Sequence, residues 1–214
     1  MDIVTDSVNR LEEILTNSGC EDTGVHLDVD PDAITCEYER GACMIASFGG
    51  RTAEFVTDDP IRAMTKISFM FGTPLEAPNV RSAACAIINV ATAFFCLTRV
   101  RRACPPASHA ACVHELAGEL NGCRVFCIGN MPALEHALGS SVTTTIDEAD
   151  VLVVNNEGLI APGTGDLMAE WAEKKRIVFL GPSTAGVSRL QQREHWCPYG
   201  QQTPGSVPDP SLLH

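Results

Sequence analysis

Three short apolar segments in the second half of the chain constrain the fold more than any other feature. They are Arg124–Ile128, Val151–Val154 and Ile177–Leu180, and each is followed by a loop of small or turn-forming residues. Short runs rich in β-branched and aromatic residues, separated by helical patterns, are typical of βαβ units and a parallel sheet. The sequence therefore predicts a parallel-sheet α/β domain over residues 109–197.

The three loops are the first place to look for a binding site. In open parallel sheets the ligand lies outside the carboxyl ends of the strands, and all three loops follow strands. We therefore expect them to line a ligand site. The candidate ligand-binding residues there are Gly129, Asn130, Asn155, Asn156, Glu157, Gly181, Pro182, Ser183 and Thr184.

The sequences of the three loops argue against an NAD site and leave other ligands open. The first lacks the second and third glycines of a dinucleotide fingerprint, so no NAD is expected. It is either an anion site at a helix N-terminus or a plain strand-to-helix turn with Pro132 at the first helical position. Ser183 has no G-x-S-x-G context, so its loop either contacts a ligand or is a structural turn. Glu157, the one carboxylate in these loops, binds a metal, acts as a base, or is a solvated side chain.

The N-terminal part predicts a small α+β domain over residues 1–75. Apolar residues recur at helical spacing over Ile3–Asn17, and the segments 25–30 and 33–39 alternate weakly. Gly49-Gly50 separates two apolar runs, which is a hairpin signal, so these segments are expected to be strands of a small antiparallel sheet. Asp59-Pro60 resembles a helix start and predicts a helix over Ile61–Phe71.

An uncharged apolar segment, Ser82–Thr98, connects the two halves. It is short for a membrane span and has Asn89 at its middle, so it predicts a buried helix within a bridging region over residues 76–108. A buried amide must be hydrogen-bonded, because an unpaired one costs about 1–3 kcal/mol. Asn89 is therefore either bound to a loop backbone between the domains or is a further ligand contact. The tail, 198–214, is rich in Pro, Gly, Gln and Ser, which favours a poorly ordered or surface-draped segment.

Charge and composition narrow the partners. The formal net charge is −12 and the pI is near 4.8, which argue against nucleic acid and anionic membranes as partners. The N-terminus has acidic residues where a signal peptide needs a basic start, so we expect a cytoplasmic protein. The apolar helices are compatible with a homodimer.

Ten cysteines are present, without the spacing of a secreted disulfide scaffold. Cys104, His109 and Cys112 lie close together in sequence, and thiolate and imidazole suit a transition metal. Their spacing matches no standard structural zinc pattern, so the alternative is a set of surface-helix residues. The only cofactor that this pattern indicates is a transition metal.

Four segments together resemble the heavy-metal chelation family, a domain of unknown function. They are AIINVATA (86–93), CRVFCIGNMPALEHAL (123–138), ADVLVVNNEG (149–158) and FLGPST (179–184). The resemblance implies an enolase-N-terminal-like leader followed by a Rossmann-like domain. It departs after the middle strand, where the family has Thr-Gly and later Asn-x-Thr and this chain retains only Thr164.

The resemblance and the residues together lead to two hypotheses. The first is a protein that binds a metal ion or a small anionic metabolite in an inter-domain cleft, as in metal chelation or handling. The second is a small-molecule enzyme that uses the strand-end cleft with Glu157 as acid or base. Either way the expected partner is a metal ion or a small molecule.

Overall fold

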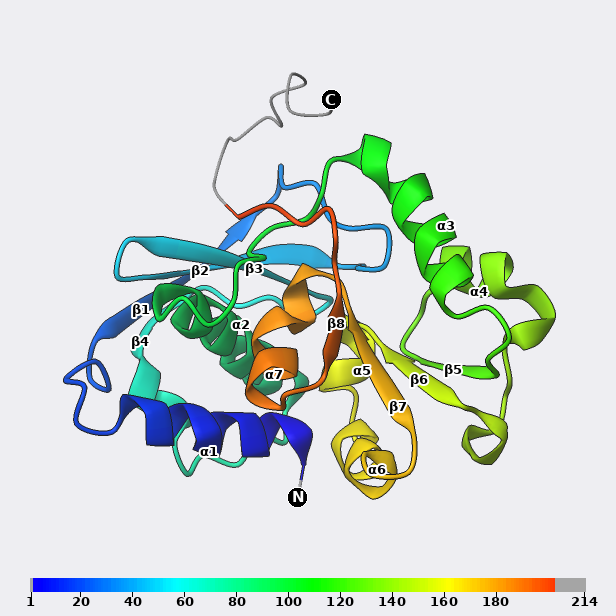
Figure 1. Ribbon diagram of the computed structural model, residues 1–214. Helices are drawn as coiled ribbons and strands as arrows, with labels where there is room; N and C mark the ends of the chain where they lie inside the picture. The colour runs from blue at the N-terminus through cyan, green and yellow to red at the C-terminus, as the bar shows by residue number, and fades with distance from the viewer. Residues whose placement is uncertain (1, 203–214) are drawn as a thin grey trace.

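The predicted parallel sheet is present in the computed structural model of the chain, which describes residues 2–202 (Figure 1). Its four parallel strands lie in sequence order: β5 (Val125–Ile128), β6 (Val151–Val154), β7 (Arg176–Leu180) and β8 (Glu194–Trp196). All of β6 is buried, with Leu152 and Val154 in one core cluster and Val151 and Val153 in the other. Burial on both faces explains why this strand is a continuous apolar run.

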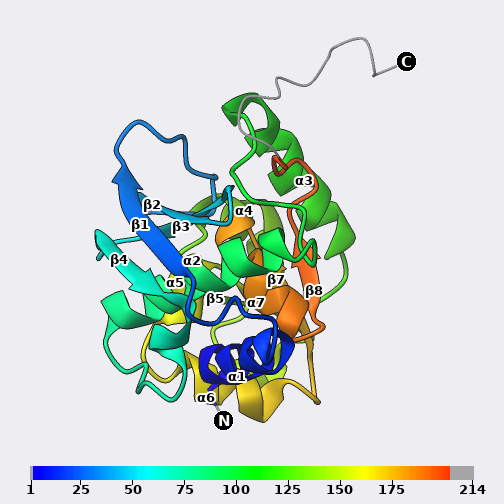
Figure 2. The same ribbon diagram turned by 90° about the vertical axis from the view of Figure 1, so that its left-hand side faces the viewer.

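The N-terminal half forms the predicted antiparallel sheet, in the order β3-β2-β1-β4. The strands are β1 (Gly24–Asp30), β2 (Ala42–Phe48), β3 (Arg51–Thr57) and β4 (Ala63–Lys66). Gly49 and Gly50 connect β2 to β3 with positive φ angles, as a two-residue hairpin requires. Figure 2 looks onto β1 and β4, with α1 (Ile3–Leu15) below them.

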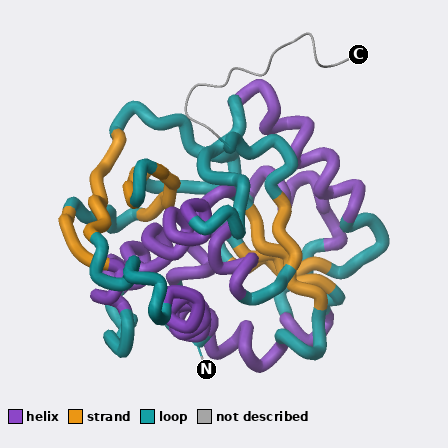
Figure 3. The backbone as a smooth tube through the Cα atoms, turned by 60° about the vertical axis from the view of Figure 1, so that its left-hand side comes forward, coloured by secondary structure: helices purple, strands orange, loops and turns teal. Residues whose placement is uncertain are grey.

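The two sheets share a layer of helices. The long helix α2 (Pro78–Phe94) is buried along almost its whole length and packs between the antiparallel sheet and α7 (Ala185–Leu190), as Figures 1 and 3 show. The segment 82–98 is therefore a core helix, as predicted, although it starts four residues earlier and ends before the left-handed Cys96.

The remaining helices flank the parallel sheet. They are α3 (His109–Glu119), α4 (Pro132–Leu138), α5 (Asn156–Ile160) and α6 (Thr164–Trp171). Short 3-10 turns lie at Ile67–Met70, Pro106–Ser108, Gly139–Ser141, Ile146–Glu148 and Pro182–Thr184. Leucines of α3 and α4 cover one face of the sheet, while α5, α6 and α7 contribute to the core that contains α2. The fold is thus the predicted mixed α/β class.

Two sequence-based expectations were wrong. The segment Ile61–Phe71 is not a helix, because residues 63–66 pair with β1 and a 3-10 turn follows. Residues 33–39 are not a strand but a loop, in which the Glu39 amide donates to the Cys36 carbonyl. Pairing with a neighbouring strand prevails over a weak local signal.

The C-terminal tail is only partly described. The backbone of Gln201 bonds to that of Arg102, while the expectation for residues 203–214 falls outside the described part of the chain. Across residues 2–202, no helix combines the length and the hydrophobicity that crossing a membrane requires.

Candidate functional site

The carboxyl ends of the parallel strands contact the 36–40 loop and β3. Asn155 donates from Nδ2 to the Tyr38 carbonyl at 2.9 Å, and its Oδ1 accepts from the Gly158 amide at 3.0 Å. Asn156 donates to the Val56 carbonyl at 2.8 Å. Both amides are fully buried. These two predicted ligand residues therefore hold the N-terminal half against the sheet.

The loop after β7 receives a carboxylate from the same chain. The Ser183 amide donates to Oε1 of Glu39 at 2.7 Å, and the Ser183 hydroxyl accepts from the Val56 amide at 2.9 Å. Gly181 has a φ of 87°, and a Cβ atom there would lie 2.9 Å from the Glu39 carboxylate, so the close approach depends on glycine. Pro182 and Thr184 are buried in the same turn. Glu39 thus occupies the place where we expected an anionic ligand.

Burial leaves the Glu39 carboxyl group short of partners. The side chain is 3% exposed, and its Oε2 atom has no hydrogen-bond partner. Burial raises the pKa of Glu39 to about 8, against the hydrogen bond from Ser183, which lowers it. At neutral pH this carboxyl group is therefore mostly protonated.

The Asn89 side chain hydrogen-bonds to backbone groups of β3 and of the segment after β7. This is the first of the two roles expected for it, a contact with loop backbone rather than with a ligand. Its Nδ2 donates to the carbonyls of Ser183 at 2.8 Å and Glu54 at 3.2 Å. Its Oδ1 accepts from the Gly186 amide at 2.8 Å. The side chain is therefore satisfied without a ligand.

The loop after β5 is also held by contacts within the protein, made with the loop after β6. A Cβ atom on Gly129 would collide with the Asn155 side chain, and the φ of 104° also favours glycine. The Asn130 amide donates to the Glu157 carboxylate at 2.9 Å, while the Asn130 carbonyl accepts from Asn155. Glu157 therefore connects two strand-end loops.

Beside this region the structure brings together two thiols that are far apart in sequence. Cys36 and Cys104 are both buried, and their side chains lie close enough for each to shift the pKa of the other. The imidazole of His109 lies next to the same sulfur. Its Nδ1 faces the Glu37 carboxylate at 3.5 Å, and its Nε2 is buried without a conventional partner. We call Cys36, Cys104 and His109 the thiol site.

Two anchors position the thiol site. The buried carboxylate of Glu54 accepts from the Ala103 amide at 2.8 Å, which fixes the backbone beside Cys104. The turn that places Glu39 against Ser183 also places Cys36, because the Glu39 amide bonds to the Cys36 carbonyl at 3.0 Å. The site therefore lies where the 36–40 loop meets the segment before α3.

The two thiols have opposite pKa shifts. The neighbouring Cys36 thiol lowers the pKa of Cys104 to about 6, opposed by burial and aided by the nearby His109. The neighbouring Cys104 sulfur and burial raise the pKa of Cys36 far above its ordinary value. The pair therefore favours a Cys104 thiolate beside a protonated Cys36 thiol.

Cys112, the third predicted metal ligand, has different partners. The Tyr38 hydroxyl donates to its sulfur at 3.6 Å, and burial raises the pKa of both groups. Within residues 2–202, no three His, Cys, Asp or Glu side chains are arranged to surround one metal ion. The close partner of Cys104 is instead Cys36, which the sequence did not single out because it lies 68 positions away, in the predicted N-terminal domain rather than the bridging region.

An open hollow borders the thiol site at His109. It has a volume of about 510 Å³, lies between α3 and α4, and is bordered by Glu37 and by the imidazoles of His109, His114 and His136. His109 is therefore the residue of the thiol site that lines this hollow.

Comparison with known proteins adds no relatives. No protein-family model, no curated protein and no solved structure matches this chain.

Proposed function

We propose that this protein binds a soft monovalent metal ion, Cu(I), between the sulfur atoms of Cys36 and Cys104. The observation that supports it is the buried thiol pair itself: Cys36 and Cys104 lie close enough to shift each other's pKa in opposite directions, with His109 beside them. Thiolates are the ligands that select soft ions such as Cu(I). This is the metal-handling function that the family resemblance suggested, located on a different pair of cysteines.

Charge balance favours a monovalent ion. The pair favours one negative charge, because the pKa of Cys104 is lowered while that of Cys36 is raised. Cu⁺ replaces that proton: the thiol of Cys36 releases H⁺, two thiolates bind the metal, and the net charge stays at −1. A buried site then gains a metal without an added desolvation cost. A divalent ion would change the charge by one unit.

Ligand number favours the same ion. Structural zinc sites need four ligands in tetrahedral geometry. Cys36 and His109 have the strongest effects on Cys104, while Cys112 and Cys197 interact with it only through charge, and no group of three is arranged around a single point in the described chain. Two thiolates are enough for a linear Cu(I) complex, and His109 at the hollow provides an entry point for the ion.

The alternative, an enzyme with Glu157 as acid or base, has less support. Its carboxylate accepts from the Asn130 amide and connects two loops, so the interaction has a structural purpose. The anion site expected at the last loop is filled by Glu39. A Glu157→Ala variant that binds a small molecule but loses turnover would favour the enzyme over the metal-binding protein.

Anaerobic competition with a coloured Cu(I) chelator tests the metal proposal. One equivalent of Cu(I) should be withdrawn from the chelator by the reduced wild-type protein, and Cys36→Ser and Cys104→Ser should each weaken the affinity at least a hundredfold. The matched control is Cys96→Ser, because Cys96 is exposed and lies outside the site. Equal loss in all three variants, or full retention in the first two, would contradict the proposal.

A further inference from the structure

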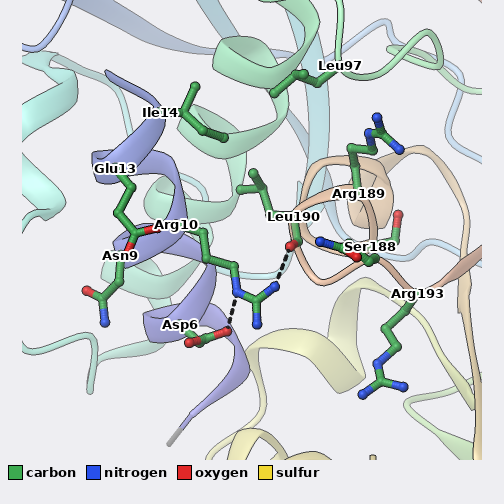
Figure 4. A pocket seen from close by; sticks show the side chains of 11 residues that line it. Asp6, Asn9, Arg10, Glu13, Ile14, Leu97, Ser188, Arg189, Leu190 and Arg193 are labelled. Atoms are coloured by element: carbon green, nitrogen blue, oxygen red, sulfur yellow. Dashed lines mark hydrogen bonds and ion pairs between the residues drawn. The ribbon is translucent and has the colours of Figure 1, made fainter. Parts of the chain in front are cut away.

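Three adjoining hollows lie on another side of the molecule. The first lies between α1, the end of α7 and the segment after α2. Figure 4 shows Arg10 reaching from α1 toward α7, with Arg189 and Arg193 on the opposite wall. This first hollow has a volume of about 1110 Å³. A second hollow, of about 220 Å³, adjoins the first. The two share the lining residues Leu97, Ser188, Arg189 and Arg193.

A third hollow of about 400 Å³ extends the same surface. It shares Thr98 and Arg99 with the second hollow, and Arg51 and Arg101 form its other walls. We call the second and third hollows together the arginine groove. The arginines that line it are Arg51, Arg99, Arg101, Arg189 and Arg193.

The charge of the groove is opposite to that of the protein. The whole chain has a net charge of −12, yet among residues 2–202 no Asp or Glu lines either hollow of the groove. His195, which also lines it, has its pKa lowered by burial, although the hydrogen bond to the Gly181 carbonyl opposes the shift. Like charges crowd there: burial, then Arg51 and Arg102, lower the pKa of Arg101.

Several of these guanidinium groups have no partner. Arg193 is paired with Glu173 at 2.8 Å. The other four make no ion pair or side-chain hydrogen bond within residues 2–202: Arg51, Arg99, Arg101 and Arg189. In a protein with 27 acidic and 15 basic residues, partners for arginines are plentiful, so leaving four unpaired around one groove is unusual.

The backbone around the groove is held in place. The Leu97 amide bonds to the Thr92 carbonyl at 2.8 Å, after a left-handed residue that ends α2. The Arg193 amide bonds to the Ser188 carbonyl at 2.9 Å, and the Ser188 hydroxyl bonds to the Ala185 carbonyl at 2.8 Å. The arginines therefore project from a fixed frame, and only their own side chains must be ordered when a ligand binds.

We propose that the arginine groove binds a small molecule that carries a diphosphate or two phosphate groups. Guanidinium groups donate paired hydrogen bonds to phosphate oxygens, and a groove of one sign of charge concentrates anions of the other. Arg99 lines both the second and the third hollow, so its guanidinium group would contact a phosphate in either one. The large first hollow, lined by Asn9, Arg10 and Glu13, has room for the organic part of the ligand.

Titration calorimetry with inorganic pyrophosphate tests this proposal on the metal-free full-length protein, at constant ionic strength in chloride buffer. We expect saturable binding of one pyrophosphate per chain. Arg99→Gln and Arg189→Gln should each weaken binding at least tenfold. The matched control is Arg62→Gln, since Arg62 is an exposed arginine that pairs with Asp28 on the antiparallel sheet, and it should leave the affinity unchanged.

Three outcomes would overturn the proposal. Absence of saturable binding would remove the site. An equal loss of affinity in the Arg62→Gln control would mean that pyrophosphate binding depends only on the net charge of the protein. Tighter binding of citrate than of pyrophosphate would assign the groove to carboxylates instead. The groove variants replace exposed, unpaired side chains, so thermal melting should confirm that they fold as wild type does. The result is independent of copper binding.

Discussion

Replacing Glu39 by glutamine keeps the shape of the buried side chain and removes its ability to ionise. The amide oxygen of glutamine still accepts the hydrogen bond from Ser183, which the carboxylate accepts at 2.7 Å. What changes is the pH dependence of stability. In wild type the Glu39 pKa rises from 4.5 to about 8 on folding, so the folded state holds a proton that the unfolded state releases.

The sign and the magnitude follow from this difference. Between pH 4.5 and 8 the folded state binds more protons, so the contribution of Glu39 to stability is present at low pH and is lost as the pH rises. Each pKa unit corresponds to about 1.4 kcal/mol. From pH 5 to pH 8, wild type should therefore lose roughly 3 kcal/mol relative to Glu39→Gln.

The comparison must be made as a difference, because Cys104 titrates in the opposite sense. Its pKa falls from 9.0 to about 6 on folding, so its contribution to stability grows as the pH rises through that range. Both proteins contain Cys104, so subtracting the two profiles removes most of this effect. Urea unfolding under reducing conditions at half-unit pH steps gives the two profiles. A constant difference between wild type and variant from pH 5 to pH 8 would refute the reasoning.

Three further predictions concern the packing and the thiol site. Asn89→Ala should destabilise the protein by about 2–4 kcal/mol in urea unfolding, because three buried backbone groups lose their partner; a loss below about 1 kcal/mol would contradict the bridging role. Gly129→Ala should cost at least about 2 kcal/mol more than Gly122→Ala, since both have positive φ but only the first would place a Cβ against another side chain; equal melting temperatures would contradict this. Ultraviolet thiolate absorbance should rise with a midpoint near pH 6, vanish in Cys104→Ser and shift to higher pH in Cys36→Ala, which removes the neighbouring thiol that lowers the pKa; a midpoint that Cys36→Ala leaves unchanged would contradict the pairing.

Local patterns were sufficient to predict most of the fold. Apart from Arg176, the strands β5, β6 and β7 consist of apolar and β-branched residues buried on one or both faces, so their composition indicates their buried position directly. β8 was missed because Glu194, His195 and Trp196 are neither apolar nor alternating, and the strand forms only by pairing with β7. The segment 63–66 is likewise a strand because it pairs with β1, and its own residues do not indicate that pairing.

The candidate site was harder to predict, because it depends on contacts across the chain. The loops after the strands were correctly located, but their side chains bind the 36–40 loop, and nothing near Glu39 in sequence indicates that it reaches Ser183. Cys104 and His109 were selected because they are neighbours in sequence. Cys36 was not, since its closeness to Cys104 requires the 36–40 loop to pack against the segment before α3.

X-ray absorption spectroscopy at the copper edge tests the central claim most directly. The sample is the reduced protein loaded anaerobically with one equivalent of Cu(I). Two sulfur ligands and no nitrogen or oxygen ligand in the first coordination shell are predicted, since the Cys36 and Cys104 sulfurs are the paired thiols at the site. A copper ion with three or more ligands, or one bound by imidazole nitrogen alone, would contradict the account.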